Sequence, residues 1–377
     1  MKKRLVVLGL LVLVGILAVT PAFAEKPKVT IWSTGSQNVS DLFTALVQAY
    51  NARPESTSEV SLQFVLSGTG EDTLASRVGA AYKTGQKNSG FDIIAENSTS
   101  MQGYVDAAGS EDLFVDLDMS KLSNYPNILI KPAIFEKKFV PYRGTTVVMA
   151  YDSARLPNPP KTWDDLYAWV QANPGKFAYN SPSTGGAGSA FVRTAIYQFL
   201  PKESYLSNDP KWADQYDKGF ELLTKFHPFL YKSGGKVVYP NKNQGTLDLL
   251  INKEVDLIPA WADQVLTNLK NGTLPDTVKI YQMEDHALGG TDVDLAVTSI
   301  GTAADNCYDF INFVISPEGQ KMCLELMNAV PVIDTSTIKS DSVNMIKDLD
   351  VKTFSVISNG SLNDTINERW DEDIATL

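Results

Sequence analysis

The sequence has few of the residues that build metal centres and nucleophilic sites. It holds only two cysteines and two histidines among its 377 residues. His227 and His286 have no cysteine or carboxylate at a metal-ligand spacing, so we expect neither a metal site nor a cofactor. The motifs G-x-S-x-G, G-x-x-x-x-G-K-[ST] and G-x-G-x-x-G are also missing, which argues against a serine hydrolase and against nucleotide use. The sequence therefore predicts a protein that is not an enzyme.

The one long apolar run of the chain lies at its N-terminus. Leu5 to Thr20 is apolar but short for a membrane span; it follows three basic residues and precedes the small-x-small sequence Ala22-Phe23-Ala24. This order predicts a secretory signal peptide over residues 1–24, cleaved after Ala24, and a periplasmic location. No cysteine lies near the cleavage site, so we expect no lipid anchor. The mature chain has 377 − 24 = 353 residues, enough for two domains with sizeable cores.

Positive charge is scarce in the mature chain. The formal net charge of −11 becomes −14 when Lys2, Lys3 and Arg4 are removed with the signal peptide. Phosphate backbones and anionic membrane surfaces repel such a chain, so we expect no nucleic-acid partner. The acidic residues are scattered along the sequence, which is typical of a solvated surface.

The two cysteines lie in two predicted helices, 303–314 and 317–327, on either side of a break at Ile315-Ser316-Pro317. Export permits a disulfide between Cys307 and Cys323 that would clamp the two helices together. Two buried free thiols would give the same sequence pattern, so both interpretations stay open.

The first half of the mature chain repeats the order strand, polar loop, helix. Runs typical of strands are found at 29–32, 60–66 and 91–95, and helical spacing at 39–51 and 73–82. This order predicts an α/β fold with mostly parallel strands. Ligands of such sheets bind beyond the carboxyl ends of strands, so the loops 33–38 and 96–100 should share one rim.

Residues 139–151 form an extended run that is too long for a typical strand and is interrupted by Pro141 and Gly144. Such a segment suits a crossover between two domains. After it, Thr162 is a good N-cap for a helix at 163–171.

The stretch 176–200 contains the densest group of glycines. We predict a strand at 177–179, a turn-rich loop at 180–186 and a helix at 189–200. The glycines at 185, 186 and 188 would let a ligand approach the backbone, and free N–H groups at the helix start would favour an anionic or hydrogen-bond-accepting group. An ordinary glycine-rich turn between strand and helix would look the same.

A second strand end carries an aromatic and an acidic residue. The predicted strand 255–260 is followed by Trp261 and Asp263. The indole is suited to stacking on a planar group or to caging a cation, with Asp263 supplying the opposite charge. The alternatives are a core aromatic for Trp261 and a helix N-cap for Asp263.

Five segments of the chain resemble the extracellular solute-binding proteins of ABC importers. They are VTIWSTGS, VVMAYDSARLPNPPKTWDDL, FAYNSPSTGGAGSAFVRTAI, VDLIPAWADQVLTNLKNGTLP and AADNCYDFINFVISPEGQKMCLELMNAVPV. The resemblance is nearest to a branch close to the thiamine, iron(III), polyamine and phosphonate binders. It implies a two-lobed periplasmic-binding fold of type II, with mixed sheets flanked by helices and a ligand cleft at the hinge. It also implies hinge closure over a solute and delivery to a membrane permease.

The resemblance divides the chain into two lobes. Lobe 1 is expected to hold residues 25–141 plus 288–330, and lobe 2 residues 142–287 plus 331–377. Crossovers are expected near Pro141–Thr145, Met283–Gly290 and Val330–Ile333.

The predicted ligand-binding residues are those in loops that follow strands, where helix starts and hydrogen-bonding groups converge. Arg143 at the hinge and Arg193 in the second half of the glycine-rich stretch are further candidates for holding an anion, and the alternative for Arg143 is a surface or structural salt bridge. The predicted set is Ser33, Thr34, Gly35, Asn97 and Ser98 from lobe 1, and Thr184, Gly185, Gly186, Gly188, Ser189, Trp261 and Asp263 from lobe 2.

The predicted site combines anion-binding helix starts with a cation-binding Trp261 and Asp263. A zwitterionic or phosphorylated cationic solute would satisfy both. Iron(III) is disfavoured because the iron binders of this superfamily carry an adjacent tyrosine pair, and no Tyr-Tyr occurs here. We expect a monomer that serves an ABC permease; the alternative is a ligand-sensing protein for a chemoreceptor or sensor kinase.

Overall fold

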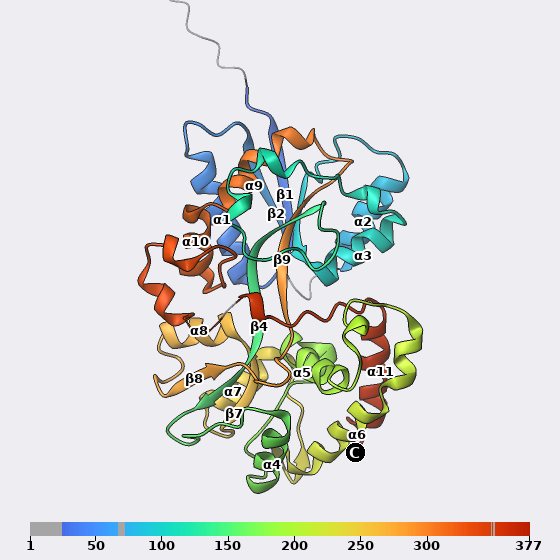
Figure 1. Cartoon of the computed structure of the whole chain (residues 1–377), viewed down its shortest axis with the longest axis vertical. Helices are drawn as coiled ribbons and strands as arrows, with labels where there is room; N and C mark the ends of the chain where they lie inside the picture. Colours follow the sequence, from blue (N-terminus) through green and yellow to red (C-terminus); the bar gives the residue numbers. More distant parts are fainter. Residues whose placement is uncertain (1–24, 67–71, 348, 350) are drawn as a thin grey trace, which may run out of the picture.

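The computed structural model describes residues 25–66, 72–347, 349 and 351–377, so the predicted signal peptide lies outside the described residues. The chain forms two lobes, one above the other in Figure 1, with strands β4 and β9 passing between them. The strands are β1 (Lys28–Gly35), β2 (Glu59–Leu66), β3 (Ile93–Asn97), β4 (Phe139–Asp152), β5 (Lys232–Ser233), β6 (Lys236–Val237), β7 (Leu257–Trp261), β8 (Val278–Tyr281) and β9 (Gly290–Val297). The helices are α1 (Gln37–Asn51), α2 (Asp72–Lys83), α3 (Ser98–Ala108), α4 (Trp163–Ala172), α5 (Gly186–Tyr197), α6 (Asp217–Phe226), α7 (Lys242–Ile251), α8 (Ala262–Lys270), α9 (Tyr308–Val314), α10 (Pro317–Met327) and α11 (Leu362–Asp373).

One seven-stranded sheet runs through both lobes, in the order β2-β1-β3-β9-β4-β7 with β8 also paired to β4. Strand β1 pairs in parallel with β2 and β3. Strands β9, β7 and β8 form antiparallel pairs. The sheet is therefore mixed, as the resemblance implied, and the expectation of mostly parallel strands holds only for β1, β2 and β3. The reason is that β9 comes from the second half of the chain and enters the upper lobe from below, opposite to its neighbour β3.

Strand β4 changes partners along its length, as the long extended run predicted. Its first part, Phe139–Thr146, pairs with β9, and its second part, Val147–Asp152, pairs with β7 and β8. The same strand is therefore part of the upper sheet and of the lower sheet. The change of partner strand falls between Thr146 and Val147, five residues beyond the lobe boundary predicted after residue 141. The division of the chain into lobes at that boundary stays a prediction.

The C-terminal segment packs on both crossing strands at two glycines. A Cβ on Gly144 of β4 would lie 2.7 Å from Val351 Cγ2, and a Cβ on Gly290 of β9 would lie 2.8 Å from Phe354 Cβ. Only glycine leaves room for this contact. The chain then continues into the lower lobe and α11 (Figure 1). The stretch Val330–Ile333, which was predicted as the third crossing, comes earlier in the chain than Val351. Its first residue, Val330, forms a bridge with Gly144 of β4.

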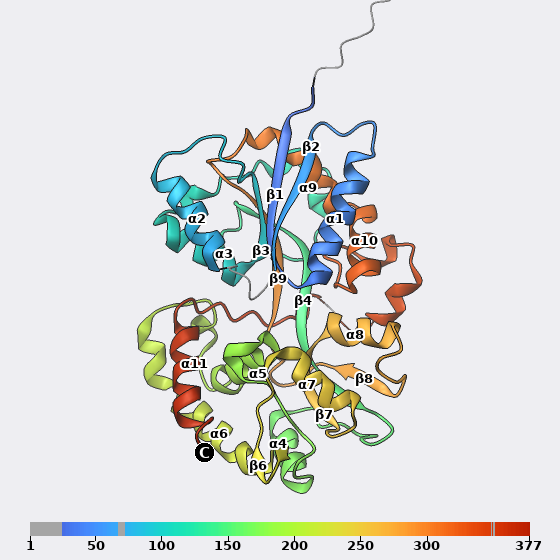
Figure 2. The ribbon, with the colours of Figure 1, turned by 180° about the vertical axis from the view of Figure 1, so that it is seen from behind.

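Helices cover both faces of the sheet in each lobe (Figure 2). In the upper lobe α1, α9 and α10 pack on one face and α2 and α3 on the other. In the lower lobe α4, α5, α6 and α11 share one core, and α7 and α8 another. Helix α1 shows why a helix packs on the sheet with one side only: its apolar residues recur three or four positions apart and form a single buried stripe. The buried side chains of α1 are Val39, Leu42, Phe43, Leu46, Val47 and Tyr50.

Both cysteines are free and buried. Cys307 and Cys323 belong to the same apolar core of the upper lobe. Burial raises the pKa of the Cys323 thiol to about 12, so it is protonated at neutral pH. Of the two interpretations left open by the sequence, the structure therefore shows two buried free thiols and no disulfide between Cys307 and Cys323.

Three local predictions need correction. The loop expected at 96–100 is the end of β3 followed by α3, which Asn97 caps. Phe177 makes a single bridge to Leu257 in place of the strand expected at 177–179. Helix α5 begins at Gly186, three residues earlier than predicted, so two of the three glycines lie inside its first turn. In the described part of the chain, no helix is long and apolar enough to cross a membrane.

Candidate ligand-binding site

Trp261 ends β7 and stands at the start of α8 in the lower lobe. Its indole lies directly against Gly186 at the start of α5: a Cβ on that glycine would lie 2.7 Å from Trp261 Cζ2. The tryptophan is partly exposed and packs only at the edge of the lower core. Two elements that are distant in sequence thus present an accessible aromatic face, which favours the ligand-binding interpretation over a core position.

Asp263 lies two residues further, in the first turn of α8. Asn38 Nδ2 of α1, in the upper lobe, lies 3.5 Å from Asp263 Oδ2. Asp263 Oδ1 is buried without a hydrogen-bond partner. Burial raises the pKa of Asp263, and the positive charge of Arg143 opposes this rise. This carboxylate therefore faces the other lobe with an oxygen that can still accept a hydrogen bond.

Arg143 lies on β4 at the passage between the lobes. It is 7% exposed, and its Nε donates to Tyr142 OH at 3.2 Å. No carboxylate of the described residues lies within ion-pairing distance of it. Its charge instead acts on Asp263 from a distance. The structure thus places a buried cation at the hinge, where its charge acts on Asp263 of α8.

The start of α5 is closed by two asparagine side chains from outside the helix. Asn180 Oδ1 accepts from Gly188 N at 2.9 Å, and Asn243 Oδ1 accepts from Ala187 N at 3.0 Å. The expectation that these N–H groups are free for a ligand was therefore wrong for both. Thr184 is likewise engaged, since its hydroxyl accepts from Lys242 N at 3.0 Å.

The glycines of this turn differ in what they contact. A Cβ on Gly188 would lie 1.9 Å from the backbone oxygen of Asn180, and one on Gly185 would lie 2.5 Å from Asn243 Oδ1. Gly188 leaves room for the backbone of Asn180, and Gly185 leaves room for Asn243 at the start of α7. Gly186 alone meets the candidate ligand-binding aromatic, Trp261.

The end of β1 is tied to the end of β3 in the upper lobe. Ser33 is 1% exposed and donates from Oγ to Ala95 O at 2.8 Å. Thr34 N donates to Glu96 Oε1 at 2.7 Å. Gly35 then adopts a φ of +134°, which only glycine adopts readily, and turns the chain into α1. These residues shape the rim; whether they contact a ligand stays a prediction.

Asn97 and Ser98 support the same rim from β3 and α3. Asn97 Oδ1 accepts from Ser100 N at 2.9 Å and so caps α3. Ser98 is buried, with its Oγ 2.9 Å from Asp292 Oδ2 and 3.1 Å from Asp294 Oδ2 of β9. One hydroxyl joins α3 to the crossing strand through two carboxyl groups.

The contacts of Ser98 with Asp292 and Asp294 indicate that one of the two carboxyl groups is protonated. A hydroxyl carries one hydrogen, so both contacts of Ser98 are full hydrogen bonds only if one carboxyl is protonated. Asp292 also accepts from Ala133 N at 2.8 Å, as an ionised carboxylate would. Asp294 is 0% exposed, its Oδ1 has no partner, and Glu96 lies opposite it on β3. Burial, together with the neighbouring Asp292, raises the pKa of Asp294 well above its ordinary value. We therefore assign the proton to Asp294.

The Asp294→Asn variant is expected to change how stability depends on pH. A carboxyl whose pKa is raised by folding stabilises the protein below its ordinary pKa, and this contribution is lost as the pH rises through the raised value. Asparagine keeps the shape of the protonated acid and carries no charge. We expect Asp294→Asn to match the wild type near pH 4 and to exceed its unfolding free energy by a margin that grows as the pH rises to 8.

Urea denaturation across this pH range measures the difference. The control is Asp371→Asn, which removes one negative charge at an exposed position of α11. A difference between Asp294→Asn and wild type that stays constant with pH would contradict the assigned proton.

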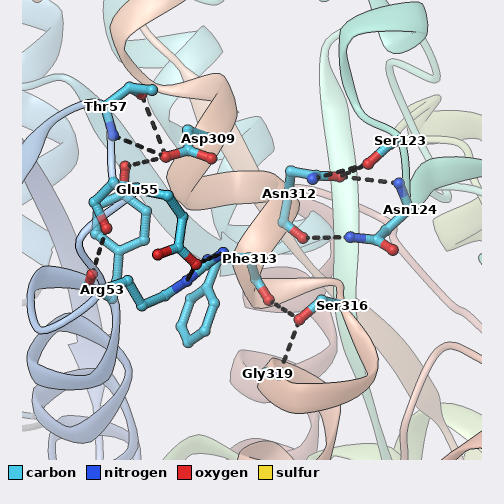
Figure 3. Close-up of polar contacts among 12 residues, drawn as sticks. Arg53, Glu55, Thr57, Ser123, Asn124, Asp309, Asn312, Phe313, Ser316 and Gly319 are labelled. Atoms are coloured by element: carbon cyan, nitrogen blue, oxygen red, sulfur yellow. Dashed lines mark hydrogen bonds and ion pairs between the residues drawn. The ribbon is translucent and has the colours of Figure 1, made fainter.

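Two pockets lie outside the Trp261 region. One, of about 260 Å³, lies at the hinge between Leu129–Lys131, Asp292 and the C-terminal segment. The other, of about 350 Å³, lies on the upper lobe around Asp309, Asn312 and Arg53. The polar groups of the second are already paired with protein: Asp309 accepts from Thr57 N at 3.0 Å and Asn312 Oδ1 from Asn124 N at 2.9 Å (Figure 3). This pairing indicates a structural joint between α9 and the loops that hold Thr57 and Asn124.

The structure thus brings together part of the predicted set. Gly186, Trp261 and Asp263 form one group in the lower lobe, and Asn38 meets it from the upper lobe. Asn38, Asn180 and Asn243 were missed by the sequence analysis. Asn38 alone had a detectable signal, since it lies in the polar loop after β1.

The fold defines the class of protein, a two-lobed periplasmic-binding fold, and solved structures share it. An extracellular solute-binding protein from Bordetella parapertussis has a TM-score of 0.70 at 14% identity, with 92% of this chain and 98% of that chain covered. An ABC transporter substrate-binding protein from Bradyrhizobium japonicum has 0.65 at 16% identity, covering 93% and 100%. A Trichodesmium protein in complex with iron and citrate has 0.65 at 14% identity, covering 92% and 99%. A search of curated protein sequences finds no significant match.

Residues 45–350 match the family described as bacterial extracellular solute-binding protein. This match covers well over half of the chain. The protein belongs to that family, as the sequence resemblance predicted.

Proposed function

We propose that this protein captures a small polar solute between its two lobes and delivers it to an ABC permease in the inner membrane. One observation carries the proposal: Asp263 of the lower lobe, two residues beyond Trp261, meets Asn38 of the upper lobe, and Trp261 pairs with the strand that joins the lobes. A solute held there would contact both lobes at once and so favour their approach. The protein binds its solute without chemical change and acts as a monomer.

The proposed solute has a planar or cationic part. The indole of Trp261 offers a face for stacking, and the unpartnered oxygen of Asp263 offers a hydrogen-bond acceptor with negative charge. A zwitterion or a phosphorylated cation fits this pair and the cationic Arg143. The basic, apolar and small-x-small segments of residues 1–24 support export through a cleaved signal peptide.

A thermal unfolding screen tests the proposal. The panel holds thiamine and its phosphates, polyamines, phosphonates, amino acids and sugars. A solute that binds only the native state raises the unfolding midpoint in a concentration-dependent way. We expect one chemical class to do so, before or after denaturation and refolding to remove any solute that purifies with the protein. No rise with any class in the refolded protein would contradict solute capture by this site.

A further inference from the structure

Arg193 lies on α5, two turns from the start of the helix, and is partly exposed, with no charged partner among the described residues. Its Nε is buried without a hydrogen-bond partner. Within the described part of the chain, its one hydrogen bond runs from Nη1 to Ile357 O, at 3.3 Å. None of the described carboxylates lies within ion-pairing distance of it, and Tyr197 is the only ionisable group that acts on it. A guanidinium has five N–H donors, so most of them are left unused.

The segments that face Arg193 contain further unused polar atoms. Asn359, two residues beyond Ile357, is 0% exposed, and the Tyr197 hydroxyl is the one side chain of the described residues that interacts with its amide, without a hydrogen bond of good geometry. Ser189, one turn before Arg193 on the same face of α5, makes only a 3.4 Å contact to Asn363 of α11.

Unused groups of this kind are costly in a folded protein. A buried polar atom without a hydrogen-bond partner, such as Arg193 Nε, destabilises a fold because it has lost its water and gained nothing in exchange. Arg155 in the same lobe shows the usual solution: its guanidinium pairs with Asp152 at 3.1 Å and with Asp256 at 2.7 Å. The contrast indicates that Arg193 is kept for something other than stability.

We propose that Arg193 binds the carboxylate or phosphate group of the solute, with Ser189 and Asn359 completing the subsite. A planar guanidinium matches either oxyanion with two parallel hydrogen bonds. The inference rests on the proposed function, because it takes the oxyanion to be one end of the captured solute.

The helix geometry then fixes the length of the solute. Gly186, under the indole of Trp261, and Arg193 are seven residues apart on α5, which corresponds to roughly 10 Å along the axis. Side chains on a helix lean toward its N-terminus, which brings the guanidinium of Arg193 over Ser189 and shortens this distance. The solute therefore carries an anionic group within about 10 Å of a planar or cationic end.

Thermal unfolding in simple oxyanions tests the subsite without knowledge of the solute. The unfolding midpoint is measured against inorganic phosphate, sulfate and acetate, each compared with chloride at the same ionic strength. The variants are Arg193→Gln and, as the matched control, Arg155→Gln. We expect at least one oxyanion to raise the wild-type midpoint in a saturable way and to leave Arg193→Gln unchanged. Without added oxyanion, Arg193→Gln should unfold at the same temperature as wild type or higher, whereas Arg155→Gln should unfold earlier and keep the oxyanion response.

The opposite results overturn the subsite. If no oxyanion differs from chloride, or if Arg193→Gln responds as wild type does, the unused groups hold water only. A low midpoint of Arg193→Gln without any oxyanion effect would give Arg193 a structural role. A panel solute that binds Arg193→Gln as tightly as wild type overturns the inference and leaves the proposed function intact. An oxyanion response lost in Arg193→Gln, together with no panel solute bound, supports the subsite and contradicts the proposed function.

Discussion

The Gly188→Ala variant is expected to be the most destabilised single substitution in the candidate site. The added methyl would lie 1.9 Å from the backbone oxygen of Asn180, and a backbone atom cannot move aside as a flexible side chain can. The substitution would also stretch the hydrogen bond from Gly188 N to Asn180 Oδ1 that closes the start of α5. Overpacking costs about 1–3 kcal/mol where neighbours can adjust, so we expect a loss above about 3 kcal/mol here.

Urea denaturation of Gly188→Ala and Gly103→Ala checks this expectation. Gly103 lies inside α3, and a Cβ there would meet no atom within 4 Å. Alanine at that position should stabilise the protein by about 0.5–1 kcal/mol, since it favours the helix. Equal unfolding midpoints for the two variants would show that the close contact at Gly188 does not exist.

The Trp261→Ala variant is expected to lose most of the affinity for the solute while the protein stays folded. The indole is partly exposed and supplies the only large aromatic face beside Asp263 and Gly186 among the described contacts. Truncating an aromatic residue at the centre of a binding site typically costs about 1.4–2.8 kcal/mol, or 10- to 100-fold in affinity. Isothermal titration with the solute identified in the screen measures this loss.

Two further variants separate binding from packing. Trp169→Ala removes a partly buried indole from α4, in the core of the same lobe, and should lower stability without changing affinity. Gly186→Ala places a methyl 2.7 Å from Trp261 Cζ2, so the ring must shift. We expect that shift to weaken binding with little loss of stability. If Trp169→Ala weakened binding as much as Trp261→Ala, the site would lie elsewhere in the lower lobe.

The sequence analysis correctly predicted the helices and caps that depend on local sequence and need no contact with distant parts of the chain. Helices α1 and α10 were placed within two residues of their observed ends, because their apolar residues recur with helical spacing and bury one stripe. Thr162 was expected to cap α4, and its hydroxyl does accept from Asp165 N at 3.1 Å. The family and its two-lobed fold also followed from local segments.

The elements that depend on distant partners were not predicted. Helix α5 begins at Gly186 because Asn180 and Asn243 close its first turn, and Asn243 lies 56 residues away in the chain. The antiparallel insertion of β9 beside β3 depends on a pairing across about half of the chain. Local propensity does not report such contacts, which is why a glycine-rich helix start was interpreted as a loop.

The candidate site was predicted in position but less well in detail. The loops after β1, β3 and β7 were chosen because ligands bind beyond the ends of strands, and Trp261 lies accessible there. The sequence could not show that Ser33, Asn97 and Ser98 use their side chains within the protein. Nor could it show that Asn38 meets Asp263, 225 residues away.

Closure of the two lobes over the solute is the central claim, and a distance between the lobes measures it most directly. Spin labels at Glu111→Cys in the upper lobe and Lys202→Cys in the lower lobe report that distance by pulsed electron resonance; both positions are exposed. The native thiols of Cys307 and Cys323 are 0% exposed and should not react with the label. We predict that the solute identified by thermal unfolding shortens the distance in the labelled protein and leaves it unchanged when Trp261→Ala is added. An identical distance distribution with and without a solute that stabilises the protein would contradict the account.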